Sequence, residues 1–279
     1  MDSEILHITI LFICILFGLI AVYLFLIMPR IIKKPKRDHL MGYYYAHRGL
    51  FNNNSDAPEN SLKAFKNAVT HNYGIELDVQ LSKDKKLVVF HDEKLKRMTG
   101  KPGKVWEYTL EELQSFKLLE SDETIPTFEA VLEAVDGKVP LIIEYKLDVP
   151  STEVCELANK VLEKYKGDYC IESFHPYALM WYKKHRPDVV RGQLSEEFWQ
   201  TPKYKTHYPL YILSLLLTNV ATRPDFIAYN CEHAFNLSRR LCKLFGALSV
   251  AWTVKNQETY NRIKDQFDLF IFDSFLLKN

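Results

Sequence analysis

The sequence predicts an α/β protein: a parallel (β/α)₈ barrel with a small β-hairpin insertion, preceded by one membrane-spanning helix. Three observations lead to this prediction. An apolar run near the N-terminus is long enough to cross a bilayer. Short apolar strands then alternate with helical patterns through the rest of the chain. Finally, acidic, basic and histidine residues occur where those strands end.

The composition excludes several classes of protein. The chain has 279 residues, and Lys+Arg 36 against Asp+Glu 35 give a net charge of +1, so no overall charge favours nucleic acid as a partner. A hydrophobic content of 47% allows a packed core and excludes general disorder. The 5 cysteines include no C-x-x-C pair, so we expect free thiols rather than a disulfide framework or a zinc site.

Residues 1–29 are assigned to a transmembrane anchor. No charged residue occurs between Ile8 and Met28. At ~1.5 Å per residue this run is about 30 Å long, the thickness of the bilayer's hydrocarbon core. The alternative is a cleaved signal peptide. The length of the run, the acidic Asp2 and Glu4 before it and the lack of a small-residue cleavage site after it favour the anchor.

Residues 30–42 form a basic linker that sets the expected orientation. No lysine or arginine precedes the span, whereas five follow it: Arg30, Lys33, Lys34, Lys36 and Arg37. Positive residues remain on the cytoplasmic side, so we expect a single-pass protein of the cell membrane with a cytoplasmic catalytic domain. The linker is also expected to contact anionic lipid head groups.

Residues 43–279 are expected to form the barrel domain. The predicted strands are Tyr43–Ala46, Ile75–Gln80, Leu141–Tyr145, Tyr169–Ser173, Val189–Leu194, Phe226–Asn230, Ser249–Thr253 and Leu269–Asp273. The predicted helices are Ser61–His71, Thr127–Val135, Thr152–Tyr165, Tyr177–His185, Ala234–Leu244 and Gln257–Gln266, with Thr127 and Asn256 as N-caps. Eight strands separated by helices are typical of a closed parallel barrel.

Two segments depart from this alternation. The residues between Gln80 and Leu87 are too few for a parallel crossover, so Leu87–Phe90 should return antiparallel as a hairpin. The segment 196–223 is rich in aromatic and aliphatic residues. It is either a buried helix that covers the barrel or an amphipathic element that docks on the bilayer beside the anchor.

Three carboxylates predict a metal site. Glu76 and Asp78 are two residues apart on one strand, so both face the barrel interior. Glu144 on the neighbouring strand adds a third acid. Buried like charges are costly without a cation between them, and three carboxylates suit one hard divalent ion, Mg²⁺ or Ca²⁺, with Mn²⁺ also acceptable. The alternative is that Lys146 and Arg48 neutralise these acids as structural ion pairs.

The same strand ends predict a phosphate pocket with two histidines. Arg48 and Lys146 can bind a phosphate beside the ion. His47 and His91 can then divide the work: one activates the nucleophile and the other protonates the leaving alkoxide. The other histidines have no comparable neighbours, with His175 a weak exception.

These residues occur in motifs that resemble the glycerophosphodiester phosphodiesterase family across residues 43–275. The motifs are Ala46-His47-Arg48-Gly49, Pro58-Glu59-Asn60-Ser61, Glu76-Leu77-Asp78-Val79, Ser82-Lys83-Asp84, Val88-Val89-Phe90-His91-Asp92, Arg97-x-Thr99-Gly100, Glu144-Tyr145-Lys146, Ser173-Phe174 and Trp252-Thr253-Val254. The resemblance implies a TIM barrel, a divalent metal, and hydrolysis of glycerophosphodiesters to sn-glycerol 3-phosphate and an alcohol.

The resemblance also implies residue roles. His47 and His91 would be the acid–base pair, and Glu76, Asp78 and Glu144 the metal ligands. Arg48 and Lys146 would contact phosphate, and Trp252 would line the glycerol end of the pocket. The chain departs from the family pattern at Lys255, at the last strand, where only Asp273 carries over, and in 196–223. These departures leave the alcohol open, and cleavage of a lysophospholipid at the membrane, as by a lysophospholipase D, is the alternative.

Overall fold

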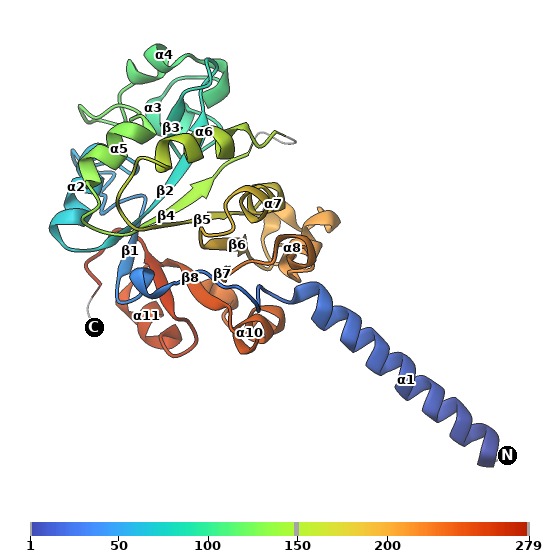
Figure 1. The fold of residues 1–279 in the computed structure, drawn as a ribbon. Coiled ribbons are helices and arrows are strands. Elements are labelled where there is room, and N and C mark those ends of the chain that lie inside the picture. The colour runs from blue at the N-terminus through green and yellow to red at the C-terminus, as the bar shows by residue number, and fades with distance from the viewer. Residues whose placement is uncertain (1, 148–150, 278–279) are drawn as a thin grey trace.

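The computed structural model, which describes residues 2–147 and 151–277, is a closed barrel with one helix projecting from it (Figure 1). Residue 1 and residues 278–279, at the ends of the predicted anchor and barrel domain, lie outside these ranges. The strands are β1 Tyr44–His47, β2 Gly74–Leu81, β3 Leu87–Val89, β4 Leu141–Tyr145, β5 Tyr169–Ser173, β6 Arg191–Ser195, β7 Phe226–Asn230, β8 Leu248–Val254 and β9 Leu269–Phe272.

The sheet topology confirms the predicted barrel. Neighbouring strands follow the order β1-β9-β8-β7-β6-β5-β4-β2-β3, and an additional pairing of β1 with β2 closes the ring. Every pairing within the ring is parallel, whereas β3 pairs antiparallel with β2 as the predicted hairpin. All eight predicted barrel strands are therefore present.

Helices surround the ring. Those described are α1 Asp2–Ile27, α2 Leu62–Thr70, α3 Lys96–Thr99, α4 Leu110–Gln114, α5 Phe128–Val135, α6 Glu153–Leu162, α7 Pro176–His185, α8 Tyr211–Ser214, α9 Asn219–Thr222, α10 Leu237–Leu244 and α11 Gln257–Ile263. Both predicted N-caps are confirmed, since the side chain of Thr127 accepts from the Ala130 N–H and that of Asn256 from the Thr259 N–H.

Two predicted element starts were wrong by two or three residues. β6 begins at Arg191 rather than Val189, because the Val189 N–H bonds to the Arg186 carbonyl in a turn after α7. α10 begins at Leu237 rather than Ala234, because the Asn236 side chain accepts from the Arg239 N–H and sets the cap there. A local turn decided the start of β6, and a local N-cap decided the start of α10.

The strand pleat divides the core into two layers. Leu77 and Val79 on β2 pack outward against the helices in the larger buried cluster. Inside the barrel, a second cluster forms around Tyr45 and Phe226, and it includes Leu40 from the linker. The Tyr45 hydroxyl donates to the Leu40 carbonyl at 2.7 Å. The linker therefore closes the end of the barrel at which the strands begin.

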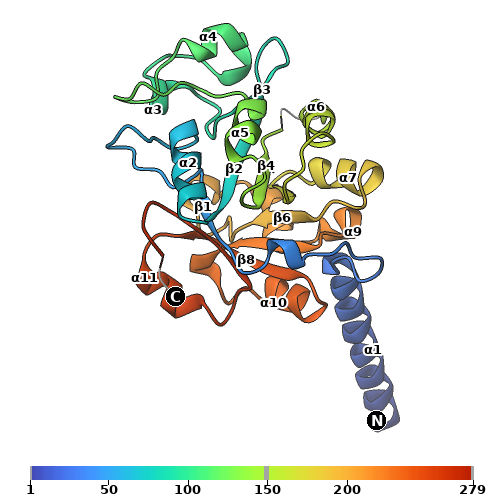
Figure 2. The ribbon, with the colours of Figure 1, turned by 60° about the vertical axis from the view of Figure 1, so that its left-hand side comes forward.

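The insertion after β2 is larger than the predicted hairpin. After β3, residues 91–126 carry α3, α4 and a short 3-10 helix Val105–Glu107. A small core of their own holds them, centred on Phe90, Leu95, Leu113 and Ile125. Figure 2 shows this excursion at the top, on the side of the molecule away from α1.

The helix α1 is long and apolar enough to cross a membrane. Glu4–Ile27 has a mean hydropathy of 3.1, and almost none of this stretch is buried by the rest of the protein. Its last carbonyl groups are bound by the barrel: Asn219 Nδ2 donates to the Ile27 oxygen at 2.8 Å, and Arg223 donates to the oxygens of Phe25 at 3.0 Å and Met28 at 2.7 Å. α1 is thus joined to the barrel at α9.

The basic linker binds the barrel as well as facing solvent. Arg30 donates to the Pro187 carbonyl at 2.7 Å, Lys34 to Gly246 at 2.8 Å, and Arg37 to the same Gly246 oxygen at 3.1 Å. Lys33 and Lys36 are exposed. The predicted contact with lipid head groups therefore falls mainly to these two lysines.

The segment 196–223 is not the single buried helix that was one of the two alternatives, and its docking on a bilayer stays a prediction. It contains two 3-10 helices, Pro202–Tyr204 and Tyr208–Leu210, followed by α8 and α9. Phe198 and Leu216 are buried, whereas Tyr208 and Ile212 are exposed. One side of the segment covers the barrel and the other side faces outward.

Candidate active site

The three predicted metal ligands meet at the carboxyl ends of two adjacent strands. Glu76 and Asp78 lie on β2 and Glu144 on β4, with Asp78 directly opposite Glu144 in the parallel register. All three side chains are buried, and one oxygen atom of each lies within 4.8 Å of those of the others. The i, i+2 spacing and the pleat bring the carboxylates together, as the sequence indicated.

This cluster carries more negative charge than the protein around it neutralises. Burial and the charges of Asp78 and Glu144 hold the pKa of Glu76 well above its usual value, and burial raises the pKa of Glu144. Lys146 Nζ lies 3.0 Å from Asp78 Oδ1 and 2.6 Å from Glu144 Oε1. In the described residues no lysine or arginine side chain lies within 4.0 Å of Glu76.

A divalent cation fits this donor set. The structural ion pairs that the sequence left as an alternative are present, but they reach only two of the three acids. Buried carboxylates that raise one another's pKa are stabilised by a hard cation between them. The three acids carry more negative charge than one lysine can offset. The cluster therefore has room for both Lys146 and a cation as sources of positive charge.

His47, at the end of β1, lies between two acids. Its Nε2 is 3.9 Å from Glu76 Oε2, and its Nδ1 is 3.9 Å from Asp273 Oδ1. Both separations exceed hydrogen-bond length. Burial lowers the pKa of His47, although the nearby Asp273 opposes this effect. The ring is therefore positioned beside the acidic cluster without being fixed by a short bond.

His91 is held by a chain of charged contacts that leads back to Arg48. Its Nδ1 lies 2.7 Å from Asp92 Oδ1, and Asp92 binds Arg97 at 2.6 Å. Arg97 in turn binds Glu59 at 2.6 Å, and the same Glu59 oxygen accepts from Arg48 at 2.6 Å. Glu59 and Arg97 occur in the family motifs, but the sequence indicated no role for either. Their contact joins segments 38 residues apart.

Arg48 and Asn60 tie the β1 loop to the acids. Arg48 Nε lies 3.7 Å from Asp78 Oδ2, and the Arg48 N–H donates to Glu76 Oε2 at 3.1 Å. Asn60 Nδ2 donates to Asp78 Oδ2 at 2.9 Å, a contact that the sequence did not indicate. The guanidinium of Arg48 is thus oriented by Glu59 on one side and faces the cluster on the other.

A fourth buried acid, Glu172, lies beside the predicted three. It is opposite Glu144 in the β4–β5 register and only 1% exposed. Its Oε2 has no hydrogen-bond partner in the described chain. Burial, followed by the charge of Glu144, holds its pKa well above the usual value. The alternation of Cys170 and Glu172 on one strand was a signal that could have placed Glu172 inside the barrel.

Trp252, on β8, forms an aromatic wall with Phe174. Its ring meets Phe174 edge-on at 5.5 Å, and Phe174 also packs near Phe198 at 6.1 Å. The buried Trp252 Nε1 has no hydrogen-bond partner in the described part of the chain. A buried indole N–H without a partner can donate a hydrogen bond to a hydroxyl oxygen of a bound ligand.

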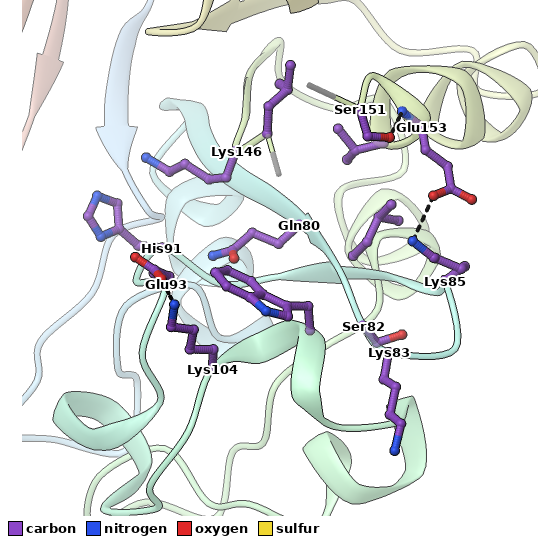
Figure 3. A pocket seen from close by; sticks show the side chains of 14 residues that line it. Gln80, Ser82, Lys83, Lys85, His91, Glu93, Lys104, Lys146, Ser151 and Glu153 are labelled. Carbon is purple, nitrogen blue, oxygen red and sulfur yellow. Dashed lines mark hydrogen bonds and ion pairs between the residues drawn. The ribbon is translucent and has the colours of Figure 1, made fainter. Parts of the chain in front are cut away.

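A cavity of about 560 Å³ opens next to His91 and Lys146, between the β2–β3 hairpin and the start of α6 (Figure 3). In Figure 3 the amine of Lys146 points toward the His91 ring, and Gln80 lies between them and the hairpin. Trp106 and Lys104 from the excursion also line the cavity. The cavity is large enough for the part of a small substrate that extends beyond the reacting group.

Comparison with known proteins agrees with this geometry. The sequence model described as "Glycerophosphoryl diester phosphodiesterase family" matches residues 47–273. A protein of Caldanaerobacter subterraneus subsp. tengcongensis named glycerophosphodiester phosphodiesterase is 33% identical over 245 residues, which are 82% of this chain and 92% of that protein. A rat protein named lysophospholipase D is 27% identical over 164 residues, 54% of this chain and 50% of its own.

Among solved structures, an Oleispira antarctica phosphodiesterase in complex with the product sn-glycerol-3-phosphate has a TM-score of 0.68. It is 23% identical, and the match covers 84% of this chain and 94% of that one. At this identity the likeness concerns the fold, and it supports the barrel assignment.

Proposed function

Because this chain belongs to the glycerophosphoryl diester phosphodiesterase family, we propose that it hydrolyses glycerophosphodiesters to sn-glycerol 3-phosphate and an alcohol. The chain is an enzyme of a hydrolase family. The observation that supports the proposal most is the buried cluster of Glu76, Asp78 and Glu144 beside His47 and Arg48. That arrangement suits a phosphodiester, whose negative charge a cation and an arginine can offset.

Glu76, Asp78 and Glu144 would hold one divalent cation, Mg²⁺ or Ca²⁺, with Mn²⁺ also acceptable. When bound, the ion would neutralise charge on the phosphodiester and polarise its P–O bonds. Arg48 and Lys146 would bind the non-bridging oxygens of the phosphate, and Trp252 would line the glycerol end through its free N–H.

His47 and His91 would carry the proton transfers. One imidazole takes the proton of the nucleophile as its oxygen forms the new bond to phosphorus. The other imidazole gives a proton to the alkoxide as the ester P–O bond breaks. The nucleophile is water, or a glycerol hydroxyl that closes a cyclic phosphate which water then opens. Asp92 supports this arrangement, because it holds the His91 ring at 2.7 Å.

The test measures release of sn-glycerol 3-phosphate from a panel of glycerophosphodiesters in Mg²⁺, Ca²⁺ or Mn²⁺, with EDTA as control. We expect release with at least one ion and none in EDTA. No release from any diester would reject the function. Undiminished release after chelation would reject only the metal assignment.

We further propose that α1 anchors the enzyme in the cell membrane with the barrel in the cytoplasm. The apolar length of α1 and the positive linker support this placement. The division into anchor 1–29, linker 30–42 and barrel 43–279 remains a prediction. A membrane-impermeant maleimide on a Leu276→Cys variant should react only after the cells are opened. Reaction in intact cells would place the barrel outside.

Cleavage of lysophospholipids is a second candidate, supported by the apolar α1 and by the similarity to the rat lysophospholipase D. Comparing kcat/KM for glycerophosphocholine and lysophosphatidylcholine with the same preparation separates the two. A preference for the deacylated diester favours the first candidate, and a preference for the lysolipid favours the second.

A further inference from the structure

One helix of the barrel exposes large apolar side chains to solvent. Leu237 and Leu244 at the two ends of α10 are 62% and 81% exposed, and Phe235 just before the helix is 76% exposed. Leu237, Arg240 and Leu244 follow one another at helical spacing and so share one face. We call Phe235, Leu237, Arg240, Lys243 and Leu244 the α10 surface.

The opposite face of α10 packs against the end of α1. Ser238 Oγ lies 2.8 Å from the Tyr23 hydroxyl, and Cys242 Sγ donates to the Ile27 carbonyl at 3.2 Å. In Figure 2, α10 lies close to the point at which α1 leaves the barrel. Because α10 contacts the last turns of α1, any bilayer that α1 spans ends close to α10.

The α10 surface also borders a groove with excess positive charge. The groove measures about 410 Å³, and Arg239, Arg240 and Lys243 line it together with one acid, Asp265. Lys243 is paired with Asp268 at 2.8 Å. Arg240 is exposed, and in the described residues no carboxylate lies within 4.0 Å of it. The groove can therefore attract an anion.

Arg239 contributes a buried positive charge to the wall of this groove. It is only 1% exposed, and its NH1 donates to Ser249 Oγ at 2.6 Å and to the Gln266 carbonyl at 3.0 Å. Its NH2 donates to the Ala234 carbonyl, and its guanidinium lies 4.2 Å from the centroid of the Phe267 ring. All these partners are neutral, and the buried Nε has no hydrogen-bond partner in the described chain. Burial lowers the pKa of Arg239 to about 10, which an anion nearby would reverse.

We propose that the α10 surface lies on the bilayer that α1 spans, and that its groove binds the phosphate of an anionic phospholipid head group. Phe235, Leu237 and Leu244 then enter the boundary between head groups and acyl chains, and Arg240 faces the phosphate, with the buried charge of Arg239 behind it. This inference rests on the anchoring role proposed for α1. It adds that a surface of the catalytic domain, and not α1 alone, contacts the membrane.

The test uses the full-length chain in phosphatidylcholine vesicles, with or without phosphatidylglycerol, and lipids that carry a quencher. Native Cys14 is exposed on α1 and the other four cysteines are buried, so a fluorophore on Cys14 reports the span. A Leu244→Cys variant in a Cys14→Ser background reports the α10 surface. Leu276→Cys in the same background is the matched control, since Leu276 is 53% exposed near the C-terminus, away from α1 (Figure 1).

We expect lipid quenching at Cys14 and at Leu244→Cys, but not at Leu276→Cys. Quenching at Leu244→Cys no stronger than at Leu276→Cys, with Cys14 quenched, overturns the inference and leaves the anchor intact. An unquenched Cys14 overturns both the membrane anchor and the inference. Cross-linking between Leu244→Cys copies without quenching assigns the surface to a second copy of the chain and also overturns the inference.

A charge variant tests the head-group site separately. Arg240→Gln should lower the ratio of docked to undocked molecules about fivefold in vesicles with phosphatidylglycerol, the factor expected for one basic group at an anionic surface. The effect should vanish in phosphatidylcholine alone. Lys184→Gln, at an exposed lysine on α7, is the control. Equal ratios for Arg240→Gln and the unchanged chain in both vesicles contradict the phosphate site.

Discussion

At the scale of single residues, the two candidate histidines differ in how they are held. His47 has an acid at 3.9 Å on each side, whereas His91 has a 2.7 Å contact to Asp92. The His91 ring is therefore oriented through its Nδ1, which leaves Nε2 for proton transfer. The two rings can accordingly serve different steps of one reaction.

Replacing either histidine should remove most of the activity. For His47→Ala and His91→Ala we expect kcat to fall by about 10²–10⁴-fold, because each ring carries one proton transfer. His185→Ala, at an exposed histidine on α7, should leave kcat unchanged. Steady-state kinetics with a glycerophosphodiester checks this prediction, and near-normal turnover in either site variant would refute its role.

Glu59 is the residue at which the series of charged contacts from His91 meets Arg48. It accepts from both Arg48 and Arg97 while only 4% exposed. Burial would raise its pKa, but Arg97 and Arg48 outweigh that effect and lower the pKa from 4.5 to about 2. The ionised form therefore stabilises the fold above pH 4.5, and this contribution disappears as the pH falls through about 2.

Glu59→Gln should lower the free energy of unfolding at neutral pH by about 3 kcal/mol, because it removes the buried carboxylate that Arg48 and Arg97 share and leaves Arg48 without its 2.6 Å partner. The difference from the unchanged chain should shrink as the pH is lowered from 4.5 toward 2. Thermal unfolding across this pH range measures it. Glu163→Gln, at an exposed acid just after α6, is the control. A difference that stays constant with pH would exclude the charge explanation.

At the scale of elements, α1 ends on the barrel rather than in a flexible connection. Arg223 donates to the carbonyl of Phe25 in its last turn and to that of Met28 just after it, and Asn219 and Cys242 both donate to Ile27. Helix ends leave carbonyl groups without partners inside the helix, and here the barrel supplies the donors. The helix α1 and the barrel are consequently held in one relative orientation.

Arg223→Ala should loosen this junction. The loss of two charge-assisted hydrogen bonds should cost about 2 kcal/mol and make the linker more sensitive to protease. Limited proteolysis of the full chain in detergent micelles measures the rate at which the linker is cleaved. Arg262→Ala removes a contact to Glu232 between exposed side chains and should change nothing measurable. Equal cleavage rates for the two variants would contradict the docked junction.

At the scale of the whole molecule, closing the ring concentrates negative charge at one place. Parallel pairing of β2, β4 and β5 brings Glu76, Asp78, Glu144 and Glu172 to the same interior region. Only the folded chain assembles this cluster, because β2 and β4 are separated in sequence by the whole excursion. A cation that binds the cluster therefore binds the native state alone.

Mg²⁺, Ca²⁺ or Mn²⁺ should accordingly raise the thermal unfolding temperature. The stabilisation is about 2.7 kcal/mol when the free ion is at a hundred times its Kd. Calorimetry of the EDTA-treated chain with and without each ion measures this without any assay of activity. Glu144→Gln should reduce the shift, and Glu133→Gln, at an exposed acid on α5, should not. Equal unfolding temperatures with and without all three ions would argue against the metal site.

Local patterns in the sequence determined the apolar helix, the eight parallel strands, the hairpin and the facing of Glu76 and Asp78, because each depends on residues a few positions apart. Only the tertiary structure decided the register of Asp78 with Glu144, the chain from His91 through Arg97 to Glu59, and the seating of α1 on α9 and α10. These contacts join residues that are distant in sequence. The residue pattern within one strand or helix does not indicate which distant element it will contact once the ring has closed.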